Sequence, residues 1–242
     1  MTDCERMDDL QFAGLRILQK TTGFRFGMDA VLLSDFARAC PGDVVADFGT
    51  GTGILPLLLW GRHKGSRFEA FEIQADMADM AARSVALNGL SECITVHHAS
   101  VEQAPTLLPP CSVDVIVCNP PYGTPGATLR NPDEARDLAR HQDERGLKPW
   151  FTAAYRLLRG RGRMALIYPA SQMLELMNGL SRAGLTPKRF RLIYPRADKP
   201  ANLVLVEACK DARPTLQPEP PLIVYEADGA LTPELRRIYH QE

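Results

Sequence analysis

Four consecutive residues, Asn119-Pro120-Pro121-Tyr122, combine hydrogen-bond acceptors with an aromatic ring directly after an apolar run at 113–118. The run predicts a buried parallel strand, which places the four residues at the edge where open α/β sheets bind ligands. Asn119 carries a side-chain carbonyl, and each proline restricts both its own φ angle and the residue before it. Two carbonyl acceptors can therefore converge on a small planar amine, with Tyr122 stacked on the ring that bears it. The alternative is a stiff turn without a chemical role.

A second candidate site is the glycine-rich segment 47–53, Asp-Phe-Gly-Thr-Gly-Thr-Gly, between a predicted strand and a predicted helix. Its glycines let the backbone turn tightly and approach a ligand closely. Dinucleotide sites also contain such loops, but their spacing is G-x-G-x-x-G, whereas the spacing here is G-x-G-x-G. Asp47 suits an ammonium group better than a pyrophosphate, and no lysine follows the loop to bind a phosphate.

Glu72 ends the next predicted strand, nineteen residues after Gly53. At that position a carboxylate can accept hydrogen bonds from both hydroxyls of a ribose. Ile73 follows and can pack on an adenine ring. The alternative for Glu72 is a surface acid at the end of a strand.

Strand and helix patterns alternate along the chain. Strand-like runs lie at 44–48, 68–72, 94–97, 113–118 and 164–168, and helix-like segments at 54–62, 74–88, 101–107, 148–158 and 171–183. Two further extended runs, 189–194 and 203–208, are separated by only eight residues. That link is too short for a helical crossover, so the two runs should pair antiparallel. The pattern predicts an α/β fold: a seven-stranded, mostly parallel sheet with a C-terminal antiparallel hairpin and helices on both faces.

The chain contains no internal repeat and no linker, so we expect residues 1–242 to form a single domain. Apolar residues at helical spacing over 28–39 favour a helical leader at 1–40. The segment 123–147 has no strand pattern, and loops of that length are usually functional or disordered. Because it follows the candidate amine-binding turn, we expect it to be a lid over the substrate. Its basic residues suit phosphates: Arg130, Arg136, Arg140, His141 and Arg145.

Composition narrows the class of protein. The longest apolar stretch, 54–60, is too short to span a bilayer, and the N-terminus does not have the pattern of a signal peptide. The six cysteines form no C-x-x-C pair, which indicates free thiols in a reducing compartment. We therefore expect a cytoplasmic protein without a membrane segment or a structural metal.

The net charge of −1 argues against non-specific coating of nucleic acid. A net charge near zero is compatible with a local basic surface. Five basic residues fall within twelve positions: Lys188, Arg189, Arg191, Arg196 and Lys199. They are either contacts for phosphates or solvated loop charges.

The chain resembles the bacterial tRNA1(Val) (adenine-N6)-methyltransferases, class I enzymes that use S-adenosylmethionine. The matching segments are 23–33, 47–53, Glu72, 119–122, 139–141, 191–195 and 221–225. The resemblance implies a Rossmann-like fold, S-adenosylmethionine as the cofactor and tRNA as the partner. The implied reaction is methyl transfer to the N6 amine of an adenosine in the anticodon loop.

The resemblance also implies the roles of the site residues. The catalytic residues would be Asn119, Pro120 and Tyr122. Cofactor contacts would come from Asp47, Gly49, Thr50, Gly51, Gly53, Glu72, Ile73, Ser100 and Asn119. Substrate contacts would come from Pro121, Tyr122, Arg140 and His141. Ser100 stands where enzymes of this type often have an Asp that holds the adenine amine, and Gln142 stands where the family usually has a Glu.

Two other functions fit part of the pattern. Methylation of a glutamine N5 amide in a release factor uses the same turn, but such enzymes usually carry a separate N-terminal helical domain, for which residues 1–43 are too few. A catalytically silent RNA-binding module could keep the fold without turnover. Cofactor binding without methyl transfer would favour the silent module.

Overall fold

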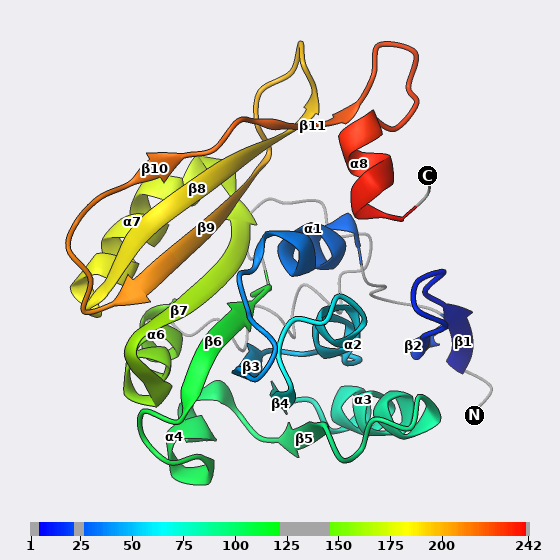
Figure 1. The fold of residues 1–242 in the computed structure, drawn as a ribbon, viewed down its shortest axis with the longest axis vertical. Coiled ribbons are helices and arrows are strands. Elements are labelled where there is room, and N and C mark those ends of the chain that lie inside the picture. The colour runs from blue at the N-terminus through cyan, green and yellow to red at the C-terminus, as the bar shows by residue number, and fades with distance from the viewer. Residues whose placement is uncertain (1–4, 22–26, 122–145, 241–242) are drawn as a thin grey trace.

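A mixed β-sheet forms the middle of the molecule, between two layers of helices (Figure 1). The computed structural model describes residues 5–21, 27–121 and 146–240. Five neighbouring strands are parallel: β5 (Ile94–His98), β4 (Arg67–Glu72), β3 (Val44–Phe48), β6 (Val113–Cys118) and β7 (Leu158–Pro169). Next to β7 lies β9 (Leu203–Lys210), which pairs antiparallel with both β7 and β8 (Leu185–Arg196). These seven strands are the ones that the sequence predicted, with the antiparallel hairpin at the expected end.

Within the described residues the sheet is nine-stranded, so the expected number of seven was too low. The additional strands are β10 (Gln217–Pro218) and β11 (Leu222–Tyr225), and both pair parallel with β8. They are too short to show a periodic pattern in the sequence. Each forms a strand because its backbone can hydrogen-bond to the exposed edge of β8.

The helices divide between the two faces of the sheet. One face carries α1 (Met28–Phe36), α2 (Ile54–Gly61), α3 (Ala75–Leu87) and α8 (Pro233–Ile238). The other carries α4 (Ala104–Leu107), α6 (Lys148–Leu157) and α7 (Met173–Arg182), with the 3-10 turns η1 (Val101–Gln103) and η2 (Ala170–Gln172). Each layer of helices packs on one face of the sheet and forms a separate apolar core with it. Val45 faces the first core, beneath α1 and α2, and Ala46 faces the second core, beneath α6 and α7. Successive strand residues alternate between the cores, which is why the central strands are apolar throughout.

The N-terminal segment is a β-hairpin followed by one helix, so the expected helical leader over 1–40 was wrong in its first half. Strand β1 (Glu5–Asp9) pairs antiparallel with β2 (Arg16–Lys20). Leu18 of β2 donates its backbone N–H to Ser84 Oγ at 2.9 Å, and Glu5 pairs with Arg83 at 2.6 Å. These partners lie on α3, more than sixty residues away. The hairpin is therefore fixed by tertiary contacts that local periodicity does not contain.

No helix in the described ranges is long and apolar enough to cross a membrane.

Candidate active site

The register of three neighbouring strands brings the predicted site residues to one edge of the sheet. Phe48 at the end of β3 pairs with Phe71 of β4 on one side and with Cys118 of β6 on the other. The next residue of each strand is a site candidate: Gly49, Glu72 and Asn119. The glycine loop, Glu72 and the turn that begins at Asn119 therefore meet at the carboxyl ends of these parallel strands, as expected for an α/β sheet.

The glycine loop turns directly above β4. The backbone N–H groups of Gly49 and Thr50 both donate to the Phe71 carbonyl, at 3.0 and 2.9 Å. Gly49, Gly51 and Gly53 have φ angles of 74°, 58° and 88°, in the left-handed region that favours glycine. A Cβ on Gly49 would lie 3.1 Å from the Trp150 ring, whereas a Cβ on Gly51 would meet no atom within 4 Å. The side of the loop at Gly51 is therefore open to a ligand.

Glu72 binds the loop that it faces. Its Oε2 accepts the backbone N–H of Gly51 at 2.9 Å, and its Oε1 accepts that of Gln74 at 2.9 Å. Its side chain is buried, yet each carboxylate oxygen keeps a second lone pair that can accept from a ribose hydroxyl. Beside it, Ile73 is 47% exposed. This exposed apolar side chain is placed where an adenine ring could cover it.

Asp47 is the unusual residue of the site. It is only 2% exposed, and neither carboxylate oxygen has a hydrogen-bond partner among the described residues. Burial raises the pKa of Asp47 from 3.8 to about 7, and the nearby Glu72 carboxylate adds to the shift. A buried carboxylate without a partner is costly. An ammonium group of a bound ligand would supply the missing donors, so the site fits a cofactor that carries one.

Ser100 has a local structural role. It is the N-cap of η1 and forms a capping box with Gln103, whose Oε1 accepts the Ser100 backbone N–H at 2.9 Å. The residue is half-buried at the end of β5. The capping box explains why a serine suits this position, and its contact with adenine stays a prediction.

The amine-binding turn is described only in its first three residues. Asn119 is half-buried, Pro120 is buried and Pro121 is exposed. Tyr122, Arg140 and His141 lie outside the described residues, as does nearly all of the expected lid at 123–147.

Two aromatic residues near the site were not identified from the sequence. Trp150 of α6 packs edge-on to Phe48, with ring centroids 6.5 Å apart, and its ring covers Gly49. Tyr168 of β7 is half-buried and level with Pro120, because Leu166 pairs with Cys118. Burial is the main reason that the pKa of Tyr168 is raised. A lone aromatic residue in a helix or strand gives no sequence signal of such a position.

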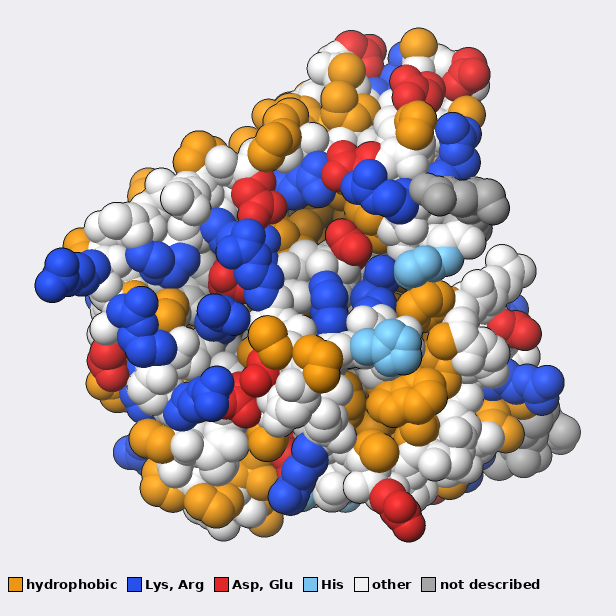
Figure 2. Space-filling view, viewed as in Figure 1, with side chains coloured by type: hydrophobic (Ala, Val, Ile, Leu, Met, Phe, Trp, Pro, Cys, Tyr) orange, Lys and Arg blue, Asp and Glu red, His pale blue; other side chains and the backbone are white. Residues whose placement is uncertain are grey.

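A cavity of about 530 Å³ lies away from this site. Its lining includes Arg38, Cys40 and Lys64, which precede β3 and β4, so it opens at the amino ends of these strands. Figure 2 shows this face hollowed, with basic and acidic side chains around the opening.

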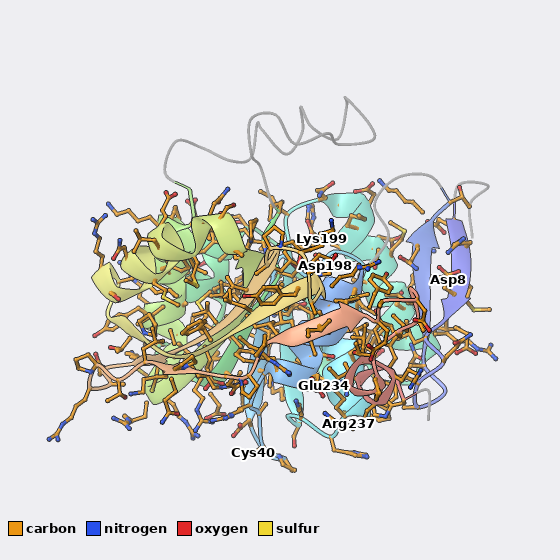
Figure 3. All side chains as sticks on the ribbon, turned by 90° about the horizontal axis from the view of Figure 1, so that it is seen from above. Asp8, Cys40, Asp198, Lys199, Glu234 and Arg237 are labelled. Carbon is orange, nitrogen blue, oxygen red and sulfur yellow. The ribbon has the colours of Figure 1, made fainter. Side chains whose placement is uncertain are left out.

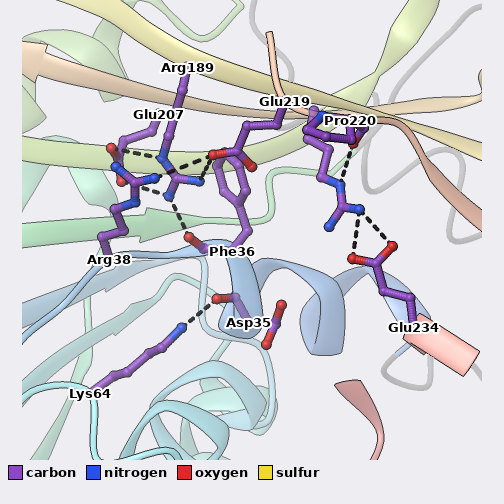
Figure 4. A network of polar contacts seen from close by, with 10 residues as sticks. Asp35, Phe36, Arg38, Lys64, Arg189, Glu207, Glu219, Pro220 and Glu234 are labelled. Atoms are coloured by element: carbon purple, nitrogen blue, oxygen red, sulfur yellow. Dashed lines mark hydrogen bonds and ion pairs between the residues drawn. The ribbon is translucent and has the colours of Figure 1, made fainter. Parts of the chain in front are cut away.

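The basic residues in that cavity are largely neutralised by the protein itself (Figure 4). Arg189 pairs with Glu207 at 3.0 Å and with Glu219 at 2.9 Å. Arg191 pairs with Glu234 at 2.7 Å. Of the five clustered basic residues at 188–199, Arg189 and Arg191 therefore form ion pairs within the protein, which connect β8 to neighbouring segments.

Comparison with known proteins gives a consistent picture. The family model described as "Methyltransferase small domain" matches residues 27–135. The tRNA1(Val) (adenine(37)-N6)-methyltransferase of Tolumonas auensis is 30% identical over 226 residues, covering 92% of this chain and 91% of that protein. The protein of the same name from Parabacteroides distasonis is 29% identical, with 86% of each chain covered.

Solved structures show the same architecture. A protein from Agrobacterium tumefaciens, described as a predicted O-methyltransferase, superposes with a TM-score of 0.71 at 24% identity, covering 88% of this chain and 96% of that one. A geranyl diphosphate C-methyltransferase from Streptomyces coelicolor, solved with S-adenosyl-L-homocysteine, gives a TM-score of 0.55 at 15% identity, covering 75% and 74%. The predicted class I methyltransferase fold is therefore confirmed.

Proposed function

Because the chain belongs to the tRNA1(Val) (adenine(37)-N6)-methyltransferase family, we propose that it transfers a methyl group from S-adenosylmethionine to the N6 amine of adenosine 37 in tRNA. Neither methylation of a glutamine amide nor a silent RNA-binding role is favoured, since relatives that match over most of the chain carry the tRNA methyltransferase name. A protein that modifies tRNA would work in the cytoplasm.

The observation that carries the proposal is the buried, unpartnered carboxylate of Asp47 beside the open loop at Gly51. S-adenosylmethionine, when bound, supplies an electrophilic methyl group on a sulfonium. Asp47 would pair with the cofactor's ammonium group and Glu72 with its ribose, and Gly51 leaves room for its backbone approach. Ile73 would cover one face of the adenine, and the Ser100 hydroxyl is a candidate contact for the adenine edge.

Asn119 and Pro120 would prepare the target amine. The lone pair of an aromatic amine is delocalised into its ring, so the amine is a weak nucleophile. Asn119 Oδ1 and the Pro120 carbonyl would accept its two hydrogens, which favours a pyramidal nitrogen whose lone pair is localised and free to attack the methyl group. The same two oxygens stabilise the positive charge that develops on nitrogen during transfer.

Positioning then supplies most of the acceleration. A strong general base is not required, because the amine proton becomes acidic only after the methyl group has joined the nitrogen. Tyr122 would stack on the target base, a contact that contributes about 1–3 kcal/mol. Pro121, Arg140, His141 and the lid at 123–147 are proposed substrate contacts, and residues 1–242 are proposed to form a single domain. An adenosine in an anticodon loop is already unpaired, which lowers the cost of turning it into the site.

The test is transfer of labelled methyl from S-adenosylmethionine to unmodified transcribed tRNA, with DNA and protein extract as parallel acceptors. The RNA is digested to nucleosides and identified by mass. We expect N6-methyladenosine in tRNA alone, and none when the target adenosine is replaced by guanosine. Label in protein alone would move the assignment to glutamine methylation.

A further inference from the structure

Three apolar or aromatic side chains of β8 and β11 pack against neither core: Tyr194, Ile223 and Tyr225. Ile223 pairs with Tyr194, and Tyr225 pairs with Arg196. Their neighbours Ile193, Leu222 and Val224 are buried in the core beneath α1 and α8. Because successive strand residues point to opposite faces, Tyr194, Arg196, Ile223 and Tyr225 share the other face of these strands. We call these four side chains, together with Lys199, the β8–β11 platform.

The platform lies at the same edge of the sheet as the candidate active site. β8 runs parallel to β7, since both pair antiparallel with β9, so its end at Arg196 is at the carboxyl edge. The backbone N–H of Ala170 donates to the Asn202 carbonyl at 3.0 Å and ties the β8–β9 turn to the end of β7. With about 4.8 Å between neighbouring strands, β8 lies about 14 Å and β11 about 19 Å from β6, which leads into Asn119.

Two members of the platform are cations. Lys199 is exposed in the β8–β9 turn, next to Asp198 (Figure 3). The Arg196 side chain is 42% exposed and pairs with Asp198 at 3.1 Å. A pair this exposed contributes about 0–1 kcal/mol, so a phosphate can replace Asp198 as the partner of Arg196.

The other three residues of the basic cluster at 188–199 already have partners within the protein. Arg189 and Arg191 are held by carboxylates, and Lys188 donates to the Arg213 carbonyl and to Thr215 at the other end of β8. The charge available at the carboxyl edge of the hairpin therefore comes from Arg196 and Lys199.

We propose that the β8–β11 platform binds the single-stranded nucleotides next to the target adenosine. Tyr225 is 39% exposed and Tyr194 is half-buried. Aromatic rings that are accessible on a sheet face stack on bases, while nearby cations contact the phosphates between them. Tyr194 and Tyr225 are diagonal neighbours, so they can hold two successive bases. That the ligand is RNA rests on the proposed function. That it binds to this platform rests on the position of the platform at the same edge of the sheet as Asn119.

The test is the affinity of the full chain for an anticodon stem-loop RNA, measured by fluorescence anisotropy in fixed salt. Tyr194→Leu and Tyr225→Leu keep apolar bulk but remove the ring, and each should weaken binding by at least about 5-fold, the equivalent of about 1 kcal/mol of stacking. Tyr194→Phe and Tyr225→Phe keep the ring and should bind within about 2-fold of the wild type. Affinity for S-adenosylmethionine should not change in any of them.

The charges are tested separately through salt. Arg196→Gln and Lys199→Gln should each lower the slope of log affinity against log salt by about 0.7, the value for one phosphate contact on a single strand. Arg213→Gln is the control, because Arg213 is exposed, as Lys199 is, but follows β9 at the opposite edge of the sheet. It should leave both affinity and slope unchanged.

Wild-type affinity in both leucine variants would overturn the platform, even if the wild type methylates tRNA. Ring-dependent binding of the stem-loop by a chain that does not methylate tRNA would support the platform and refute the proposed function. Equal losses in the leucine and phenylalanine variants would also count against stacking.

Discussion

The backbone N–H of Gly51 donates a 2.9 Å hydrogen bond to Glu72 Oε2, which joins the glycine loop to the end of the neighbouring strand. The carboxylate that we propose as the ribose contact therefore also fixes the conformation of the glycine loop. If the proposal holds, a change to the Glu72 side chain should alter both the loop conformation and cofactor binding.

We expect Glu72→Gln to weaken S-adenosylmethionine binding by about 10-fold or more and to lower the melting temperature. An amide has one acceptor oxygen, so its NH2 group must face the backbone N–H of Gly51 or of Gln74, and an unmade buried hydrogen bond costs about 1–3 kcal/mol. Isothermal titration and thermal unfolding measure the two effects. Glu92→Gln, at an exposed position, is the control, and an unchanged cofactor affinity in Glu72→Gln would contradict the assignment.

Asp47 should make the stability of the unbound protein depend on pH. Its pKa is raised by burial to about 7, so between about pH 4 and 7 the folded protein holds a proton that the unfolded chain has lost. The free energy of unfolding should therefore fall as the pH rises through this window and level off above it. Asp47→Asn should remove this decrease and be the more stable protein at pH 8.

The same substitution should weaken cofactor binding, because the ammonium group loses its carboxylate. In the wild type, affinity for S-adenosylmethionine should rise with pH through about 7 as Asp47 ionises. Urea unfolding at pH 5 and pH 8, with and without cofactor, measures both effects. A stability difference between wild type and Asp47→Asn that does not change with pH would show that Asp47 does not titrate in this window.

Asn119→Ala should nearly abolish methyl transfer while weakening cofactor binding far less, since eight other residues are predicted to contact the cofactor. The substitution removes one of the two acceptors for the amine, and loss of one group that stabilises transition-state charge typically lowers the rate by about 100- to 1,000-fold. Single-turnover methylation of tRNA measures the rate, and titration with S-adenosylhomocysteine measures the affinity. A wild-type rate in this variant would refute the proposed mechanism.

Gly49→Ala should mainly lower protein stability, whereas Gly51→Ala should mainly weaken cofactor binding. Both place alanine at a positive φ, at a cost of about 1–2 kcal/mol. Only Gly49→Ala also puts a Cβ 3.1 Å from Trp150, so it should destabilise the protein more. Gly51→Ala projects into open space and should instead weaken cofactor binding.

A second substitution separates the two costs at Gly49. Trp150→Phe removes the ring atoms nearest to the new Cβ, so Gly49→Ala should cost less in the Trp150→Phe background than in the wild type. Urea unfolding of the four proteins gives the coupling. Additive losses would mean that Trp150 does not restrict this position.

Much of the candidate site was predictable because its signals are local in the sequence. Gly49 to Gly53 and the segment that begins at Asn119 each follow a strand directly, and parallel strands bring their carboxyl ends to one edge of the sheet. The antiparallel hairpin of β8 and β9 was likewise required by its short link. The N-terminal hairpin was not predictable, because Leu18 and Glu5 find their partners on α3.

By itself the sequence determined which groups the chain carries: the glycine loop, the acid before it, the carboxylate at the end of the next strand and the Asn-Pro-Pro-Tyr segment. Only the tertiary structure decided that Asp47 is buried without a partner, that Trp150 covers Gly49, and that Arg189 is neutralised by Glu207. Burial, close packing and ion pairing depend on residues far apart in the chain. A sequence pattern can therefore predict which groups are present at an edge of a sheet, whereas the packed fold sets which of them remain available to a ligand.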